Sequence, residues 1–180
     1  SQIRTRHLDR LAAEGMAFTD AHASSAVCTP SRYSLLTGRY NWRSWLKEGV
    51  TWGYSPAVIE PGRLTVASYL KEHGYATACV GKWHLGWTWP RRGSGEEDVD
   101  WERPIADGPL TRGFDAFFGI GASLDMPPYV YVEGDRVTAI PDRIAPASEG
   151  KAFWRQGPIA PDFCHEEVLP RLTEWALAFI

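Results

Sequence analysis

The 180-residue sequence has few cysteines, no long hydrophobic run and no excess of positive charge. Its 3 cysteines are too few for a disulfide framework, and no C-x-x-C pair is present to bind zinc. No apolar run approaches the roughly 18 residues that a membrane span requires. The formal net charge of −3 leaves no broad positive field of the kind that attracts nucleic acid or anionic lipid. We therefore expect a folded protein without a membrane span and without a nucleic-acid partner.

The composition is otherwise that of a globular protein with unusual loops. Hydrophobic residues make up 44% and charged residues 23%, which excludes an intrinsically disordered chain. A chain of 20.1 kDa is long enough to bury the core of one domain. The 9 Trp, 17 Gly and 13 Pro favour long ordered loops that pack around aromatic side chains.

Hydrophobic periodicity predicts that helices and strands alternate, which indicates an α/β fold. Apolar residues at helical spacing predict helices at 5–14, from 30 onward, at 64–73 and at 166–180. Alternating or β-branched segments predict strands at 16–23, 75–80 and 114–120, and a hairpin at 129–139. No internal repeat and no clear domain boundary divides the sequence.

Cys28 begins the first string of residues with chemical potential. Residues 28–32 read Cys-Thr-Pro-Ser-Arg, and Thr-Gly-Arg follows at 37–39. A lone cysteine before a helix is most often a buried structural residue. A cysteine-dependent phosphatase needs five residues between its cysteine and its arginine, but Ser34 occupies the arginine position, so that chemistry is excluded. A third interpretation depends on another string farther along the chain.

This second string, at 74–86, reads Gly-Tyr-Ala-Thr-Ala-Cys-Val-Gly-Lys-Trp-His-Leu-Gly. Together the two strings resemble the two signatures of the formylglycine-dependent (type I) sulfatases, in the same order along the chain. Residues 8–12 and 113–119 are also similar to that family. The resemblance covers most of the chain and is weakest between residues 141 and 161.

The resemblance implies an alkaline-phosphatase-like fold, which is a three-layer α/β sandwich with a mixed sheet. Because the sequence starts at Ser1 and stops within an apolar run, we expect residues 1–180 to be an internal portion of the N-terminal catalytic domain of a longer sulfatase. The implied activity is hydrolysis of a sulfate ester to an alcohol and inorganic sulfate, with a sulfated saccharide as a candidate substrate. The implied location is periplasmic, secreted or lysosome-like.

By resemblance, a separate maturation enzyme oxidises Cys28 to Cα-formylglycine. The hydrated aldehyde is a geminal diol, of which one oxygen attacks the sulfur and the other later allows the sulfate to leave. Arg32 would hold the diol hydroxyls, Lys82 would bind the sulfate oxygens, and His84 would help to remove a proton. Lys82 and His84 can face one pocket if their segment is extended. Taken singly, they are more typical of a surface lysine and a packed histidine.

The family also uses Ca²⁺, for which the modified Cys28 would be one ligand. The sequence departs from the family pattern here, because no Asp-Asp pair precedes Cys28. Asp9 and Asp20 stand apart, and the remaining metal ligands would lie beyond residue 180. The acidic run at 96–100 is more typical of a solvated loop than of a metal site.

Two further residues are candidates for substrate binding. Tyr54 lies between the two signatures, where some related sulfatases place an active-site tyrosine. Asp125, within Leu-Asp-Met-Pro-Pro-Tyr at 124–129, resembles a segment of bacterial sulfatases that act on sulfated sugars, although a loop-capping role fits equally well. Several tryptophans fit either a carbohydrate cleft or loop packing: Trp42, Trp45, Trp52, Trp87, Trp89 and Trp101.

Two rival functions remain open. A phosphonate or phosphodiester hydrolase of the same superfamily would share the geometry, but a second negative charge on its substrate needs more cations than Arg32 and Lys82 supply. A non-catalytic glycan-binding protein would use the tryptophan-rich loops and would leave Cys28 unmodified. The presence of both signatures favours the sulfatase.

Overall fold

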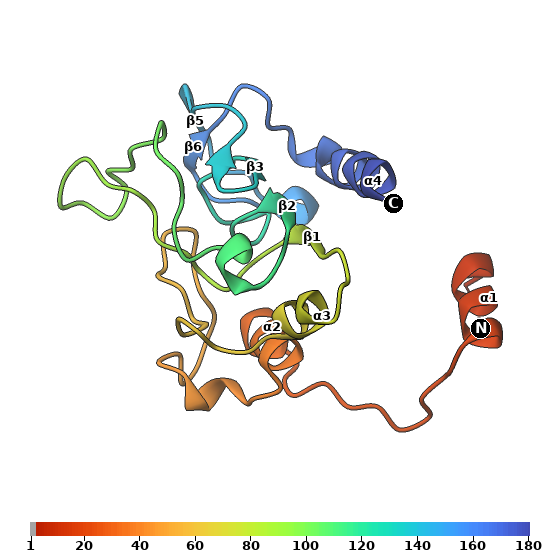
Figure 1. Ribbon diagram of the computed structural model, residues 1–180. Coiled ribbons are helices and arrows are strands. Elements are labelled where there is room, and N and C mark those ends of the chain that lie inside the picture. Colours follow the sequence, from red (N-terminus) through yellow and green to blue (C-terminus); the bar gives the residue numbers. More distant parts are fainter. Residues whose placement is uncertain (1–2) are drawn as a thin grey trace.

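The computed structural model describes residues 3–180, in which a mixed β-sheet lies between helices (Figure 1). Its strands follow the order β1-β2-β3-β4. β1 (Ala78–Lys82) and β2 (Ala116–Ile120) are parallel. β3 (Val132–Glu133) and β4 (Arg136–Val137) extend the sheet in antiparallel register. A separate antiparallel pair is formed by β5 (Arg143–Ala145) and β6 (Gly157–Ile159).

Helices form the layers on either side of the sheet. α2 (Cys28–Thr37) and α3 (Val66–Glu72) contact each other on one side, and α4 (Val168–Phe179) packs against β1 and β2 on the other (Figure 1). Short 3₁₀ turns connect these elements: η1 (Asn41–Arg43), η2 (Pro109–Arg112), η3 (Gly150–Ala152) and η4 (His165–Glu167). The layers confirm the predicted α/β class with a mixed sheet.

Local sequence signals explain where the helices begin and end. The Thr65 hydroxyl accepts a hydrogen bond from the Ser68 amide, and the Ser68 hydroxyl accepts one from the Thr65 amide, so α3 begins with a capping box. α2 ends at Gly38, whose φ of 66° is the left-handed conformation that glycine adopts without a steric penalty. The predicted helices, the strands near 75–80 and 114–120, and the hairpin all form within a few residues of their predicted positions.

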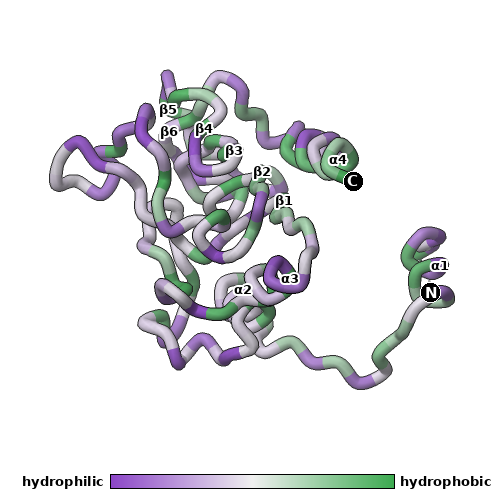
Figure 2. Tube along the Cα trace, viewed as in Figure 1, coloured by the Kyte–Doolittle hydropathy of each residue, from purple (hydrophilic) through white to green (hydrophobic). Residues whose placement is uncertain are grey.

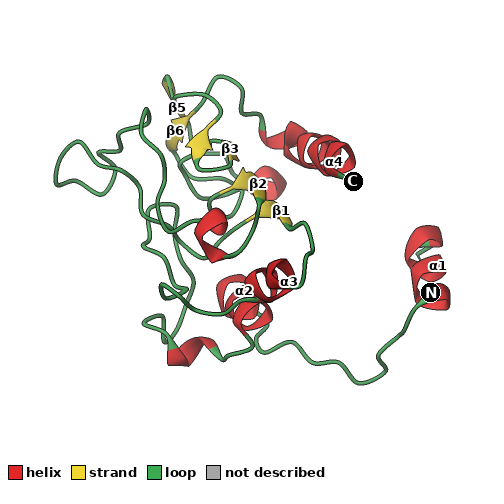
Figure 3. Ribbon diagram, in the orientation of Figure 1, coloured by secondary structure: helices red, strands yellow, loops and turns green. Residues whose placement is uncertain are grey.

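Long loops dominate the chain (Figure 3), and aromatic side chains from these loops share the core with aliphatic ones. Trp83 and Trp87 are each 2% exposed. The buried indole N–H groups donate hydrogen bonds to backbone carbonyls. Trp83 donates to the Gly86 carbonyl and Trp89 to the Gly53 carbonyl, each at a distance of 2.8 Å. Such bonds remove the cost of burying a polar group, so the tryptophans anchor the loops to the sheet. The predicted aromatic anchoring of the loops is confirmed.

Residues 3–27, here called the N-terminal arm, lie apart from this core (Figure 1). α1 (Arg6–Glu14) has no buried residue, and apolar positions follow it along an exposed segment (Figure 2). The predicted strand at 16–23 is wrong, because these residues form turns and extended chain, with Phe18 76% exposed. Alternation of apolar and polar residues makes a strand only where a neighbour completes the hydrogen bonds, and no described strand pairs with this segment.

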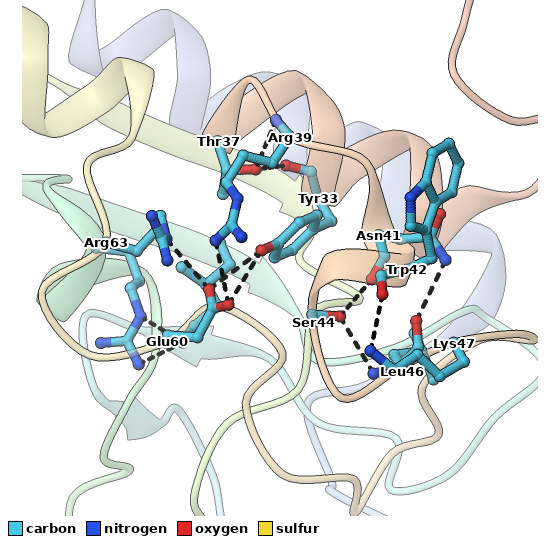
Figure 4. A network of polar contacts seen from close by, with 12 residues as sticks. Tyr33, Thr37, Arg39, Asn41, Trp42, Ser44, Leu46, Lys47, Glu60 and Arg63 are labelled. Atoms are coloured by element: carbon cyan, nitrogen blue, oxygen red, sulfur yellow. Dashed lines mark hydrogen bonds and ion pairs between the residues drawn. The ribbon is translucent and has the colours of Figure 1, made fainter.

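A polar network fixes the C-terminal end of α2 to the loop before α3 (Figure 4). The Glu60 carboxylate accepts a hydrogen bond from the Tyr33 hydroxyl at 3.1 Å and pairs with Arg39 and Arg63, each at 3.4 Å. Burial alone would raise the pKa of Glu60, but its hydrogen bonds and the Arg63 charge lower it. The Thr-Gly-Arg string therefore serves, through Arg39, to hold the helix in place.

Candidate active site

The N-terminal end of α2 meets the loop that follows β1. Cys28 is the first residue of α2, and Val27 before it is extended with φ −116° and ψ 149°. Pro30 is tolerated in this first turn because amides there have no partner within the helix. The buried Thr29 hydroxyl donates to the His84 carbonyl at 2.9 Å. This bond ties the start of the first signature to the end of the second.

Arg32 lies one helical turn after Cys28 and reaches the end of β1. Its Nη1 donates a hydrogen bond to the Lys82 carbonyl. Burial raises the pKa of Cys79 to about 11, and the nearby positive charge of Arg32 acts in the opposite direction. The high pKa keeps the Cys79 thiol protonated at neutral pH, as expected for a core cysteine.

Lys82 is the last residue of β1 and is partly buried. Its side chain borders a groove together with Ile120, Leu124 and Leu172. The ion pairs formed among residues 3–180 all use other cations, so neither Lys82 nor Arg32 is neutralised by a carboxylate of the described chain. Two cations without carboxylate partners, both of which act on His84, give this end of α2 a local positive potential.

His84 is fully buried, and its backbone φ of 52° is left-handed. The assumption that residues 82–84 are extended is therefore wrong, because the strand ends at Lys82 and the chain turns sharply. Histidine is among the residues that tolerate this conformation, and its use at a buried position is a form of local strain. The turn nevertheless keeps the imidazole close enough to Lys82 and Arg32 to feel both charges.

The two ring nitrogens of His84 have different environments. Nε2 lies 2.7 Å from the Thr51 carbonyl, which has no proton, so Nε2–H is the donor. Nδ1 is buried and has no hydrogen-bond partner within the described chain. Burial lowers the pKa of His84 to about 4, and the Lys82 and Arg32 charges add to this effect. At neutral pH the ring is uncharged and Nδ1 is an available proton acceptor.

Tyr54 is placed differently from these four residues. Its ring packs against the core and its hydroxyl is buried without a partner in the part of the chain that is described. Burial raises the pKa of Tyr54 far above its usual value, and the nearby Glu97 carboxylate adds to the increase. The described contacts do not join Tyr54 to Cys28 or to His84.

Asp125 lies closer to the candidate site, because its charge is felt at His84. Burial would raise the pKa of Asp125, but hydrogen bonds from Arg155 and Ser123 lower it overall. Arg155 forms an ion pair with the Asp125 carboxylate. Sequence reasoning singled out neither Arg155 nor Thr51, because each contact joins residues that are at least 30 positions apart in the sequence.

The described residues do not form a calcium site. Within residues 3–180 no three His, Cys, Asp or Glu side chains come together in a group that could hold a metal ion. Asp9 and Asp20 are exposed on the N-terminal arm. A hard cation needs six or more oxygen ligands, so the donor set of these residues does not fit Ca²⁺.

A family model described as Sulfatase matches residues 1–169. The chain belongs to the sulfatase family. It is 43% identical over 140 residues to an N-acetylgalactosamine-6-O-sulfatase of Bacteroides thetaiotaomicron, a match that covers 78% of this chain and 26% of the relative. It is also 43% identical over 127 residues to mouse arylsulfatase G, covering 68% of this chain and 20% of that protein.

A solved sulfatase structure has the same fold. It is described in connection with the metabolism of multiple glycosaminoglycans by Bacteroides thetaiotaomicron, and it matches with a TM-score of 0.76 and 32% identity. The match covers 98% of this chain and 42% of that chain, so the sulfatase fold and the partial coverage of the catalytic domain are both confirmed.

The chain spans about a fifth to a quarter of the length of the curated relatives that it matches. Sulfatases are generally calcium-dependent and carry a formylglycine residue. No helix in residues 3–180 has the length and apolar character needed to cross a membrane.

Proposed function

We propose that the protein containing this chain hydrolyses a sulfate ester to an alcohol and inorganic sulfate. The observation that carries the proposal is the pair of cations, Arg32 and Lys82, that no carboxylate of the described chain neutralises. They flank a neutral, buried His84 that has one free acceptor nitrogen. A small anion that develops charge during reaction suits this combination of donors and base.

In this proposal Cys28 carries the formylglycine, which the maturation enzyme installs after reading the Cys-Thr-Pro-Ser-Arg string. The hydrated aldehyde supplies a nucleophilic oxygen and a second hydroxyl that permits sulfate release. Lys82 binds the sulfate oxygens and stabilises the charge that develops on them. Arg32 holds the hydroxyls on residue 28, one turn away on the same helix.

His84 accepts the proton of the second hydroxyl at Nδ1. The Thr51 carbonyl supports this role by holding the proton on Nε2, so that the lone pair resides on the other nitrogen. The hydrogen bond from the Thr29 hydroxyl to the His84 carbonyl holds residue 84 close to the start of α2. Calcium ligands other than the modified Cys28 would have to come from outside the described residues, and none of these roles depends on that ion.

A sulfated saccharide is the substrate class we propose. Support comes from the relative named as an N-acetylgalactosamine-6-O-sulfatase and from the structural neighbour described with glycosaminoglycan metabolism. Asp125 adds a carboxylate that can accept hydrogen bonds from sugar hydroxyls near His84. Sulfatases generally act in secreted, lysosomal or periplasmic settings, and we propose the same for this protein.

Peptide mass spectrometry across Cys28, on full-length protein from its native source, tests the proposal. The expected result is an aldehyde in place of the thiol. An unmodified thiol would remove Cys28 from the catalytic assignment and would favour the glycan-binding rival.

Steady-state kinetics on an aryl sulfate and an aryl phosphonate distinguish the two hydrolase functions. We expect turnover of the sulfate to exceed that of the phosphonate and to fall by about a thousandfold or more in Cys28→Ala, because the nucleophile is lost. A preference for the phosphonate would instead support the rival hydrolase. The glycan-binding rival predicts saccharide binding with no turnover and no effect of the substitution.

A further inference from the structure

Three loops that are distant in the sequence converge beside His84. They carry residues 52–53, 123–128 and 153–157. Gly53 lies so close to the second loop that a Cβ at this position would be 1.7 Å from the Pro127 carbonyl oxygen, which only glycine permits. Gly157, on the third loop, is likewise pressed against the Pro127 ring. The convergence is therefore a packed feature of the fold.

Arg155 is held at this convergence by contacts on several sides. Its Nη1 pairs with the Asp125 carboxylate and also lies 3.2 Å from the Asp125 carbonyl, which in addition accepts the Arg155 amide at 3.2 Å. The Arg155 carbonyl accepts a hydrogen bond from the Tyr129 hydroxyl at 2.6 Å. The guanidinium carbon lies 5.0 Å from the ring centre of Trp52 and 5.1 Å from that of Phe153.

The same groups remain accessible. The side chains of Arg155 and Asp125 are 40% and 28% exposed. Trp52 is 51% exposed and Phe153 is 49% exposed. The described hydrogen bonds of the guanidinium use only Nη1, so Nε and Nη2 keep their donors. A fixed carboxylate, free guanidinium donors and half-exposed rings thus share one surface, and its Asp125 carboxylate is felt at His84.

We propose that Asp125, Arg155, Trp52 and Phe153 form the subsite that holds the sugar ring carrying the sulfate ester. This inference rests on the proposed sulfatase function. The Asp125 carboxylate accepts hydrogen bonds from ring hydroxyls, the Arg155 donors bind a neighbouring hydroxyl or carbonyl oxygen, and an aromatic ring packs on the apolar face of the sugar. The class of ligand is a sulfated saccharide with free hydroxyls beside its ester.

The ion pair has a second consequence for an anionic substrate. An unpaired Asp125 would repel a sulfate ester approaching Lys82, whereas the Arg155 charge neutralises the carboxylate. Arg155 thereby positions Asp125 and removes the repulsion. The subsite acts on binding of the sugar and leaves the reacting groups at Cys28 unchanged.

Kinetics on two substrates test the inference with full-length protein. N-acetylgalactosamine 6-sulfate carries the sugar, and an aryl sulfate does not. Arg155→Ala is expected to raise KM for the sugar at least tenfold with kcat changed less than threefold. It should raise KM for the aryl sulfate by a smaller factor, because only the repulsion from the unpaired Asp125 acts on that substrate. Arg155→Lys keeps the charge without the planar guanidinium, so its KM for the sugar should lie between those of the native protein and Arg155→Ala. Trp52→Ala should also raise the sugar KM severalfold.

Matched controls come from the same chain. Arg143 forms an exposed ion pair with Asp142 at 2.8 Å, and the aromatic side chain of Tyr75 is 62% exposed. Arg143→Ala and Tyr75→Ala should leave the sugar KM unchanged. Equal losses on both substrates, or an unchanged sugar KM in Arg155→Ala and Trp52→Ala, would overturn the subsite.

Binding measurements separate this inference from the proposed function. Titration calorimetry of N-acetylgalactosamine 6-sulfate into Cys28→Ala and into Cys28→Ala/Arg155→Ala requires no turnover. We expect the second protein to bind at least tenfold more weakly, and equal affinities would contradict the subsite. If the native protein hydrolyses neither substrate, the proposed function fails, yet this comparison still decides whether the sugar binds here. If Arg155→Ala does not fold, Arg155→Lys and Trp52→Ala are compared instead.

Discussion

The two ends of α2 differ in whether the charged side chains around them are paired. At the C-terminal end, Glu60 is surrounded by Tyr33, Arg39 and Arg63, and each of these groups contacts the carboxylate (Figure 4). At the N-terminal end, the Arg32 guanidinium donates to the Lys82 backbone carbonyl, and no carboxylate within residues 3–180 forms an ion pair with Arg32 or with Lys82. One short helix therefore separates a region where the charges are paired, around Glu60, from a region where the charges of Arg32 and Lys82 are unpaired.

The contrast indicates which end is free to bind something else. A network in which donors and acceptors satisfy one another stabilises the fold and offers little to a ligand. Cations without counter-charges favour the binding of an anion. We therefore assign the C-terminal end to stability and the N-terminal end to function. Three experiments can break or sharpen this division, and they are ordered here by the size of the expected effect.

The largest effect is expected from Lys82→Ala. If Lys82 stabilises charge on a sulfate ester, kcat/KM should fall by about a hundredfold to a thousandfold. Stability should change little, because the ammonium has no ion pair in the described part of the chain to lose. Kinetics on an aryl sulfate and urea unfolding of the same preparation measure both quantities.

Lys71→Ala is the control for this experiment. Lys71 is 51% exposed and its ammonium pairs with Asp115 on the surface, so its removal should leave kcat/KM within a factor of two. If Lys82→Ala retained full activity, or lost activity only by unfolding, the functional assignment of this end of α2 would be wrong.

An intermediate effect is expected from the titration of His84. Its pKa is about 4 in the folded protein and 6.5 without the fold. Between these values the unfolded chain binds more protons, so stability is fully present above pH 6.5 and falls as the pH drops toward 4. The contribution is on the order of 3 kcal/mol across that interval.

Urea unfolding at pH 7, 6 and 5 measures this dependence. His84→Gln keeps a donor for the Thr51 carbonyl but cannot titrate, so its stability should fall less between pH 7 and 5 than that of the native protein. His7→Gln, at an exposed position of α1, measures in parallel the effect of a His-to-Gln change outside the site. Parallel slopes for the native protein and His84→Gln would show that this buried imidazole does not titrate as described.

Sequence reasoning identified the candidate site because its signals are local. Cys28 and Arg32 lie within one turn of helix, and Lys82 and His84 lie two positions apart. The structure brings these four residues to one place through the bonds of Thr29 to His84 and of Arg32 to Lys82. The helices with one apolar face and the strands with apolar runs are predictable for the same reason, because their hydrophobic periodicity is visible along the sequence.

Long-range geometry could not be predicted in this way. The left-handed backbone of His84 is imposed by packing between Thr51 and Gly121, to which its side chain and its amide are bonded. The ion pair of Arg155 with Asp125 depends on contact between two loops whose residues lie 30 positions apart in the sequence. At residues 16–23 the alternating pattern was present but the partner strand was not. Pattern alone cannot supply a contact with a distant segment.

The smallest effect is expected from Glu60→Gln, which removes the charge at the C-terminal end of α2. The amide still accepts a hydrogen bond from Tyr33 but no longer pairs with Arg39 or Arg63. The carboxylate is 35% exposed, so solvent screens both pairs, and we expect a loss of about 1 kcal/mol in the free energy of unfolding.

Activity on an aryl sulfate should stay within twofold of the native value in Glu60→Gln, because this end of α2 only holds the helix. The stability difference should shrink in 1 M salt, where the screening length falls to about 3 Å. Glu48→Gln, at an exposed position without an ion pair in the described chain, should change neither quantity. A large loss of activity with intact stability would mean that the Glu60 network sets the geometry of Cys28 and Arg32 through the helix. In that case the two ends of α2 would form a single functional unit.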